Sequence, residues 1–181
     1  MDDHVPRVSA ITNREEIPEG HRHNFDLIEE SRGQVSGPFA VLLNSPEVGG
    51  RVGHLGTYIR FESQLSDQER ELAILTTARE FDCAYEWAVH EPLAREAGVR
   101  DEALEIVTDR RSVDTLTVTE AIIVRYGRVL LRDHEVPDTL FHTAKDHFGV
   151  QGITDLTATI GYYSLLACVL NAFDVTPDEG T

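Results

Sequence analysis

Residues 79–98 carry side chains whose types and spacing could do chemistry: a thiol at Cys83, a carboxylate at Glu86 and an imidazole at His90. On a helical wheel at about 100° per residue, Glu86 and His90 fall inside the apolar arc that includes Cys83. Their separation of four residues lets the carboxylate and the imidazole interact. Cys83 lies one turn nearer the helix start, where backbone amides favour a thiolate. Such groups on an apolar face are candidates for shifted pKa values and acid–base catalysis.

The preceding segment, residues 66–81, also places an ionisable side chain on its apolar face. Glu71 falls in the middle of its apolar arc, among leucine and alanine positions. Burying an unpaired carboxylate costs several kcal/mol, so Glu71 needs a partner or a polar cavity. The short link at Phe81 and Asp82 makes the two segments natural antiparallel neighbours with apolar faces that can meet. The sequence therefore predicts polar groups enclosed by a central helix hairpin.

Structural alternatives stay open for each of these residues. A Glu–His pair inside a helix hairpin is also compatible with a structural polar network, and a lone cysteine is usually a small buried hydrophobe. Trp87 is a candidate substrate-binding residue, although tryptophan is more often part of a core. The chain has no H-E-x-x-H or comparable ligand pattern, so we expect no metal and no other cofactor.

The composition limits the partners that we expect. The net charge is −16, from 32 acidic and 16 basic residues, and a surface this negative disfavours nucleic acid and anionic membranes. The two cysteines, Cys83 and Cys168, form no C-x-x-C pair, which argues against a disulfide scaffold, a zinc finger and a dithiol centre. We see no apolar run near the length of a membrane span and no signal sequence, so we expect a cytoplasmic protein.

Helix signals dominate the chain, and no stretch shows β alternation, which predicts an all-α protein of seven or eight helices. Two capping boxes, Ser66 with Glu69 and Thr117 with Glu120, mark helix starts. Pro92 should kink or break its helix. We predict an N-terminal arm over 1–23, a single helical domain over 24–175 and a flexible tail over 176–181.

The stretch "ERELAILTTAREFDCAYEWAVHEPLAREAGV" (69–99) strongly resembles the signature of the carboxymuconolactone decarboxylase family, which shares its fold with alkylhydroperoxidase D. The stretches "SPEVGGRVGHLGTYIRFESQLS" and "GYYSLLACVLNAF" also resemble longer members, so the likeness covers most of 37–175. The resemblance implies an alkylhydroperoxidase D-like all-α fold and a homo-oligomer built around helix hairpins, commonly a trimer or hexamer.

The resemblance divides between two branches of the family. The alkylhydroperoxidase pattern has a glutamate, a C-x-x-C pair twelve residues on, and a histidine four residues after the second cysteine. Glu71, Cys83 and His90 match that pattern, but Glu86 stands where the second cysteine would be. Disulfide cycling within one chain is therefore not available. The decarboxylase branch is similar at Glu86 and His90, with its own E-x-x-x-H, but usually lacks the cysteine.

Three functional hypotheses follow. The first is an acid–base enzyme acting on a small carboxylate- or carbonyl-bearing substrate, with His90 exchanging the proton, Glu86 tuning it and Glu71 serving as a second base or relay. The second is a one-cysteine alkylhydroperoxidase of peroxiredoxin type that attacks through Cys83. The third is a non-catalytic oligomer that binds a small ligand. Three arginines are possible carboxylate anchors: Arg51, Arg60 and Arg79.

Overall fold

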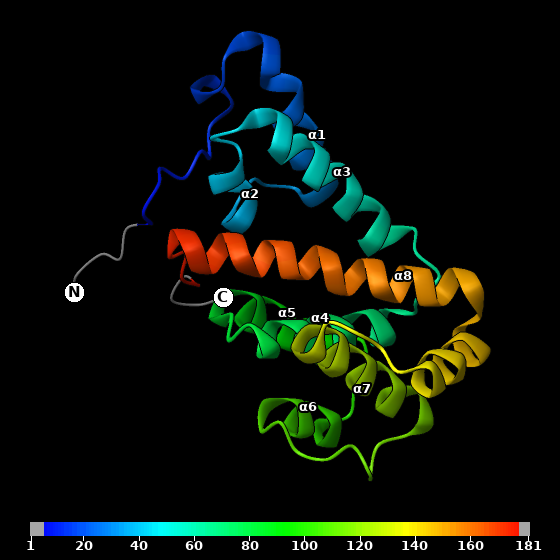
Figure 1. The fold of residues 1–181 in the computed structure, drawn as a ribbon. Helices are drawn as coiled ribbons and strands as arrows, with labels where there is room; N and C mark the ends of the chain where they lie inside the picture. The colour runs from blue at the N-terminus through cyan, green and yellow to red at the C-terminus, as the bar shows by residue number, and fades with distance from the viewer. Residues whose placement is uncertain (1–5, 178–181) are drawn as a thin grey trace. The chain divides into compact units, whose positions relative to one another are not determined.

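The computed structural model describes residues 6–177, and this range is helical with no strand (Figure 1). The predicted all-α fold is therefore confirmed. Two short 3₁₀ helices precede eight α-helices: η1 (Arg14–Glu16), η2 (Glu19–His21), α1 (Arg22–Arg32), α2 (Gly37–Leu42), α3 (Pro46–Phe61), α4 (Asp67–Glu80), α5 (Ala84–Glu96), α6 (Asp101–Thr108), α7 (Val118–Asp133) and α8 (Asp138–Phe173). Gly149, at φ 71° and ψ 176°, divides α8 into two helical segments.

The described residues form two compact units. One unit comprises 6–62 and 168–177, and the other comprises 63–167. Residues 1–5 of the predicted N-terminal arm and residues 178–181 of the predicted tail lie outside the described residues. Within the rest of the predicted arm, η1 and η2 are helical and Ile17 is buried. The predicted boundaries at residues 23 and 175 stay predictions.

In the first unit, α1 packs against α3, and it approaches closely at two glycines of α3. A Cβ atom added at Gly50 would lie 1.9 Å from Oδ1 of Asn24, and one at Gly53 would lie 2.8 Å from Cγ1 of Ile28. Each glycine lowers the intrinsic helix stability of α3 by about 1 kcal/mol relative to alanine. The close approach explains why glycine is nevertheless used at these two positions.

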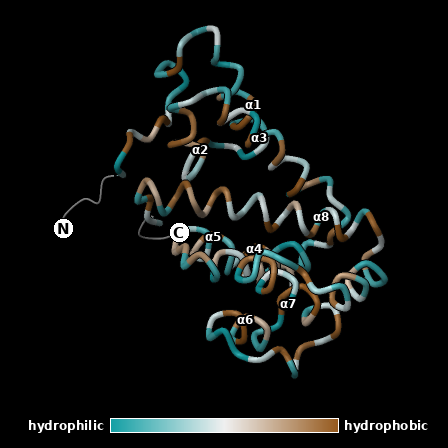
Figure 2. Tube along the Cα trace, in the orientation of Figure 1, coloured by the Kyte–Doolittle hydropathy of each residue, from teal (hydrophilic) through white to brown (hydrophobic). Residues whose placement is uncertain are grey.

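In the second unit, α4 is the central helix and packs against α5, α6 and α7. Both predicted capping boxes are present: Ser66 with Glu69 begins α4, and Thr117 with Glu120 begins α7. Hydrophobic residues recur along these helices (Figure 2) and form one continuous core of the unit. Glu71 lies on α4, on the same helix that supplies much of this core.

Pro92 does not break its helix, contrary to that part of the expectation. The helix α5 runs from Ala84 to Glu96 without interruption. Pro92 is exposed, and Ala88, whose carbonyl loses its helical partner, is partly exposed, so water can satisfy that carbonyl.

The helix α8 corrects a second expectation. By length and composition it is long and apolar enough to cross a membrane, and its most apolar 18-residue window has a mean hydropathy of 1.4. Asp155 is the only charged residue between 150 and 173, which accounts for this hydropathy. Core helices of soluble proteins pass the same test, and Leu156 and Ile160 of α8 do lie in the core of the second unit.

Candidate functional site

The helices α4 and α5 position the predicted site residues, and a two-residue turn at Phe81 and Asp82 joins them. Asp82 has φ 47°, a left-handed conformation that aspartate tolerates better than most residues. The amide of Cys83 then donates to the carbonyl of Ala78 at 2.9 Å, and the carbonyl of Cys83 accepts from the amide of Trp87 at 3.1 Å. Cys83 is therefore the N-cap of α5. The turn brings the two helices together as the predicted hairpin.

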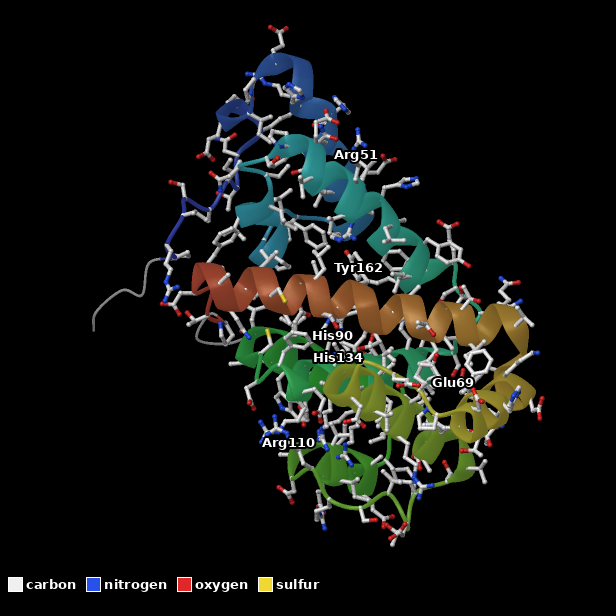
Figure 3. The ribbon with its side chains drawn as sticks, viewed as in Figure 1. Arg51, Glu69, His90, Arg110, His134 and Tyr162 are labelled. Atoms are coloured by element: carbon white, nitrogen blue, oxygen red, sulfur yellow. The ribbon has the colours of Figure 1, made fainter. Side chains whose placement is uncertain are left out.

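Glu71, Glu86 and His90 converge inside this hairpin, and Figure 3 labels His90 of this group. Nδ1 of His90 lies 2.6 Å from Oε2 of Glu71 on α4, and Nε2 of His90 lies 3.4 Å from Oε2 of Glu86 on α5. Each of the three residues is only 3% exposed. The structure thus brings together three of the four predicted catalytic residues, although their catalytic roles stay predictions. We call these three residues the carboxylate–imidazole cluster.

Two further side chains contact the cluster, and the sequence did not predict either of them as part of it. The ring of Tyr163 on α8 meets the ring of His90 edge to face, with centroids 5.1 Å apart at 88°. Nε of Arg70 lies 3.8 Å from Oε1 of Glu71. No local pattern could identify Tyr163, because it lies 73 positions after His90 in the sequence. Arg70 is adjacent to Glu71, but adjacent residues on a helix do not normally face each other.

The two glutamates next to His90 determine the direction in which its pKa is shifted. Burial by itself would lower the pKa of His90, but its hydrogen bonds to Glu71 and Glu86, together with the negative charges of both carboxylates, raise that pKa above its ordinary value. His90 therefore keeps its second proton to a higher pH than an exposed histidine does.

Cys83 and Trp87 face a different space from the cluster. They line an open pocket of about 380 Å³, together with Ala78, Arg79, Asp82, Ala84 and Thr108. Glu71, Glu86 and His90 are not among its lining residues. Cys83 is 2% exposed, whereas Trp87 is only partly buried. Cys83 lies one helical turn before Glu86 and is the predicted catalytic residue that lines the pocket.

Of the three arginines considered as anchors, Arg79 lies at the pocket. Its Nε donates to the carbonyl of Thr108 at 2.7 Å, and its Nη1 lies 2.5 Å from Oδ1 of Asp82. Arg51 and Arg60 belong to α3 in the first unit. Within residues 6–177 there is no group of three or more His, Cys, Asp and Glu residues suited to holding a metal ion.

Comparisons with known proteins agree with this architecture. Residues 46–121 match the Carboxymuconolactone decarboxylase family, which confirms the predicted resemblance and includes the α4–α5 hairpin. No curated protein sequence matches the chain at a significant level.

Solved structures share the fold at low sequence identity. An alkylhydroperoxidase AhpD core protein, an uncharacterized peroxidase-related protein from Ralstonia eutropha JMP134, superposes with a TM-score of 0.76 at 16% identity, covering 97% of this chain and 94% of that one. An uncharacterized peroxidase-related protein from Silicibacter sp. TM1040 gives 0.72 at 19% identity, covering 90% and 87%. A cysteine-to-alanine variant of the debrominase Bmp8, in complex with 2,3,4-tribromopyrrole, gives 0.70 at 12% identity, covering 95% and 92%. These likenesses establish an alkylhydroperoxidase D-like fold.

Proposed function

We propose that this chain, whose residues 46–121 match the Carboxymuconolactone decarboxylase family, is an enzyme that transfers protons to or from a small carboxylate- or carbonyl-bearing substrate. The observation that carries the proposal is the carboxylate–imidazole cluster, in which Glu71 and Glu86 both face His90 at 3% exposure. Enclosing these ionisable groups has an effective penalty of several kcal/mol per ion. Folding alone does not require that penalty, whereas proton transfer uses it to shift pKa values.

The pocket beside Cys83 and Trp87 is the proposed substrate site. A volume of about 380 Å³ suits a small molecule. Arg79 is the proposed carboxylate anchor, because its contacts with Asp82 and Thr108 fix the guanidinium at the pocket wall, and guanidinium groups bind carboxylates with defined geometry. Removing carbon dioxide from such a substrate leaves a carbanion or enolate that must be protonated. A positioned acid contributes typically about 10²–10⁴-fold to such a step.

A second candidate is a one-cysteine peroxidase, and a specific observation favours it: Cys83 lines the pocket, and the cluster residues do not. At the N-cap of α5, helix amides favour the thiolate. The thiolate would attack a hydroperoxide, break its O–O bond and release an alcohol, leaving a sulfenic acid at Cys83. Two equivalents of an external thiol would then reduce the sulfenic acid, yielding water and a disulfide of that reductant. Peroxidase-related proteins among the structural neighbours support this candidate.

One experiment separates the candidates. We would test small lactones, β-keto acids and organic hydroperoxides with the wild type, Cys83→Ser, Glu86→Gln and the surface control Glu96→Gln. Proton-transfer chemistry predicts that Glu86→Gln loses activity while Cys83→Ser keeps it, and thiol chemistry predicts the reverse. The control, exposed on the same helix, should match the wild type. If no substrate reacts while Glu86→Gln changes only thermal stability, the third hypothesis, a non-catalytic ligand-binding protein, replaces both.

A further inference from the structure

The two nitrogens of His90 have the same kind of neighbour. Nδ1 faces a carboxylate oxygen of Glu71 at 2.6 Å, and Nε2 faces a carboxylate oxygen of Glu86 at 3.4 Å. A neutral imidazole carries one N–H and one lone pair, so it can donate to only one of them. If both glutamates were ionised, the lone pair would point at a second anion. In a buried site that contact is repulsive and unrelieved by water.

Counting protons resolves the conflict. One proton lies between His90 and Glu71. A second proton is required between His90 and Glu86, either on Nε2, giving an imidazolium, or on Glu86, giving a neutral carboxyl group that donates to Nε2. Both arrangements leave the cluster with a net charge of −1, against −2 with one proton. The guanidinium of Arg70, 3.8 Å from Glu71, partly offsets the remaining charge.

The groups around His90 leave Glu86 as the exit for the second proton. Glu71 on α4 occupies Nδ1, Glu86 on α5 faces Nε2, and Tyr163 from α8 covers the ring edge to face. The imidazole therefore has no ring nitrogen left for a substrate. Glu86, unlike Glu71, lies on the helix whose N-cap is Cys83. Glu86 also lies one turn from Cys83, which lines the pocket.

We infer that the carboxylate–imidazole cluster holds two protons at neutral pH and that the second one leaves the cluster through Glu86, the member one turn from Cys83, rather than directly from His90. This inference rests on the proposed proton-transfer function. Glu86 does not line the pocket, so it passes the proton on towards the pocket, and His90 and Glu71 are positioning residues that act through Glu86. Because the resting cluster is loaded with a proton, the enzyme would act as an acid in its first proton transfer. A substrate that develops a carbanion or an enolate needs such a donor.

The proton count is tested on the full chain without any substrate. At pH 7, ¹⁵N NMR of labelled histidine should show His90 as an imidazolium, or difference infrared spectra should show a protonated carboxyl band. His90→Gln identifies the histidine signal, and Glu86→Gln should abolish whichever signal is present. A neutral His90 with no carboxyl band would overturn the inference.

The role of Glu86 is tested with an active substrate. Glu86→Gln should lower kcat at least tenfold more than His90→Gln does, and Glu71→Gln should move the pH profile without abolishing turnover. Wild-type rates in Glu86→Gln combined with complete loss in His90→Gln would show that the imidazole contacts the substrate itself. If the wild type converts none of the tested substrates, the proposed function fails. The spectra still decide whether the cluster holds two protons.

Discussion

Replacing Glu71 with alanine should destabilise the unit that contains the site. The change removes the closest partner of His90, at 2.6 Å, from a position where both side chains are almost fully enclosed. Removing one partner of a buried charged pair leaves the other without compensation and costs about 3–5 kcal/mol. For a chain of this length each kcal/mol lowers Tm by roughly 2–4 °C, so the expected loss is roughly 6–20 °C.

The assay can report on this unit directly. Trp87 is the only tryptophan of the chain, and it lies on α5, the helix that carries Glu86 and His90, so thermal unfolding followed by its fluorescence monitors this unit. Glu71→Gln keeps an acceptor for Nδ1 and should lose less stability than Glu71→Ala. Glu96→Ala, an exposed glutamate on the same helix as His90, should leave Tm nearly unchanged.

The difference in Tm between wild type and Glu71→Ala should change with pH in a defined direction. The pKa of His90 is raised because hydrogen bonds to Glu71 and Glu86 and the charges of both outweigh the effect of burial. A raised folded-state pKa contributes stability that is fully present below the unfolded value, about 6.5, and is lost as pH rises through the folded value. The gap in Tm between wild type and Glu71→Ala should therefore be widest near pH 6 and narrow towards alkaline pH. Equal Tm values at pH 6, or a gap that widens with pH, would refute the pairing.

Two other predictions concern contacts away from the cluster. Gly50→Ala should destabilise the α1–α3 packing by about 1–3 kcal/mol in urea unfolding followed by circular dichroism, because the new methyl group would lie 1.9 Å from Oδ1 and 3.0 Å from Cβ of Asn24. Gly161→Ala, which meets nothing within 4 Å, is the matched control and should not destabilise. Arg100→Gln should lower Tm near neutral pH, because the hydrogen bond from Arg100 lowers the pKa of Glu120. That contribution is present above the unfolded pKa of about 4.3 and lost as pH falls through the folded value, so wild type and variant should differ in Tm at pH 6 and converge in strong acid.

The local features of the sequence predicted the hairpin well. Capping boxes at Ser66 and Thr117 mark helix starts because a side chain must satisfy the first amides, and that requirement is local. The inward placement of Glu71, Glu86 and His90 follows from helical periodicity, which is local too. Each of these features needs only a short window of sequence, and each is present in the structure.

The features that sequence reasoning missed depend on distant parts of the chain. A wheel drawn for one helix cannot show that Tyr163 of α8 covers His90, or that the carbonyl of Thr108 holds Arg79 at the pocket. The sequence also left open whether Trp87 binds substrate or belongs to a core, and it could not show that a pocket leaves this residue partly open. Side-chain reach matters as well: Arg70 approaches Glu71 although their Cβ directions differ by about 100°.

Position 86 offers the sharpest test of what the chain does with its thiol. Glu86 stands where the alkylhydroperoxidase pattern has its second cysteine, and its carboxylate faces Nε2 of His90. Glu86→Cys would place two thiols three residues apart at the start of α5, a spacing at which Cα atoms lie within disulfide range. It would also remove the carboxylate that shares the second proton.

We therefore expect Glu86→Cys to form an intramolecular disulfide with Cys83 after treatment with hydrogen peroxide, detected as the loss of two thiols per chain. Hydroperoxide turnover with an external dithiol should rise above that of the wild type, while any proton-transfer activity should fall as it does in Glu86→Gln. The double variant Cys83→Ser/Glu86→Cys controls for oxidation of the new thiol alone. If the wild type already reduces hydroperoxides as fast as Glu86→Cys, the carboxylate does not suppress thiol chemistry, and the one-cysteine peroxidase becomes the better reading of this site.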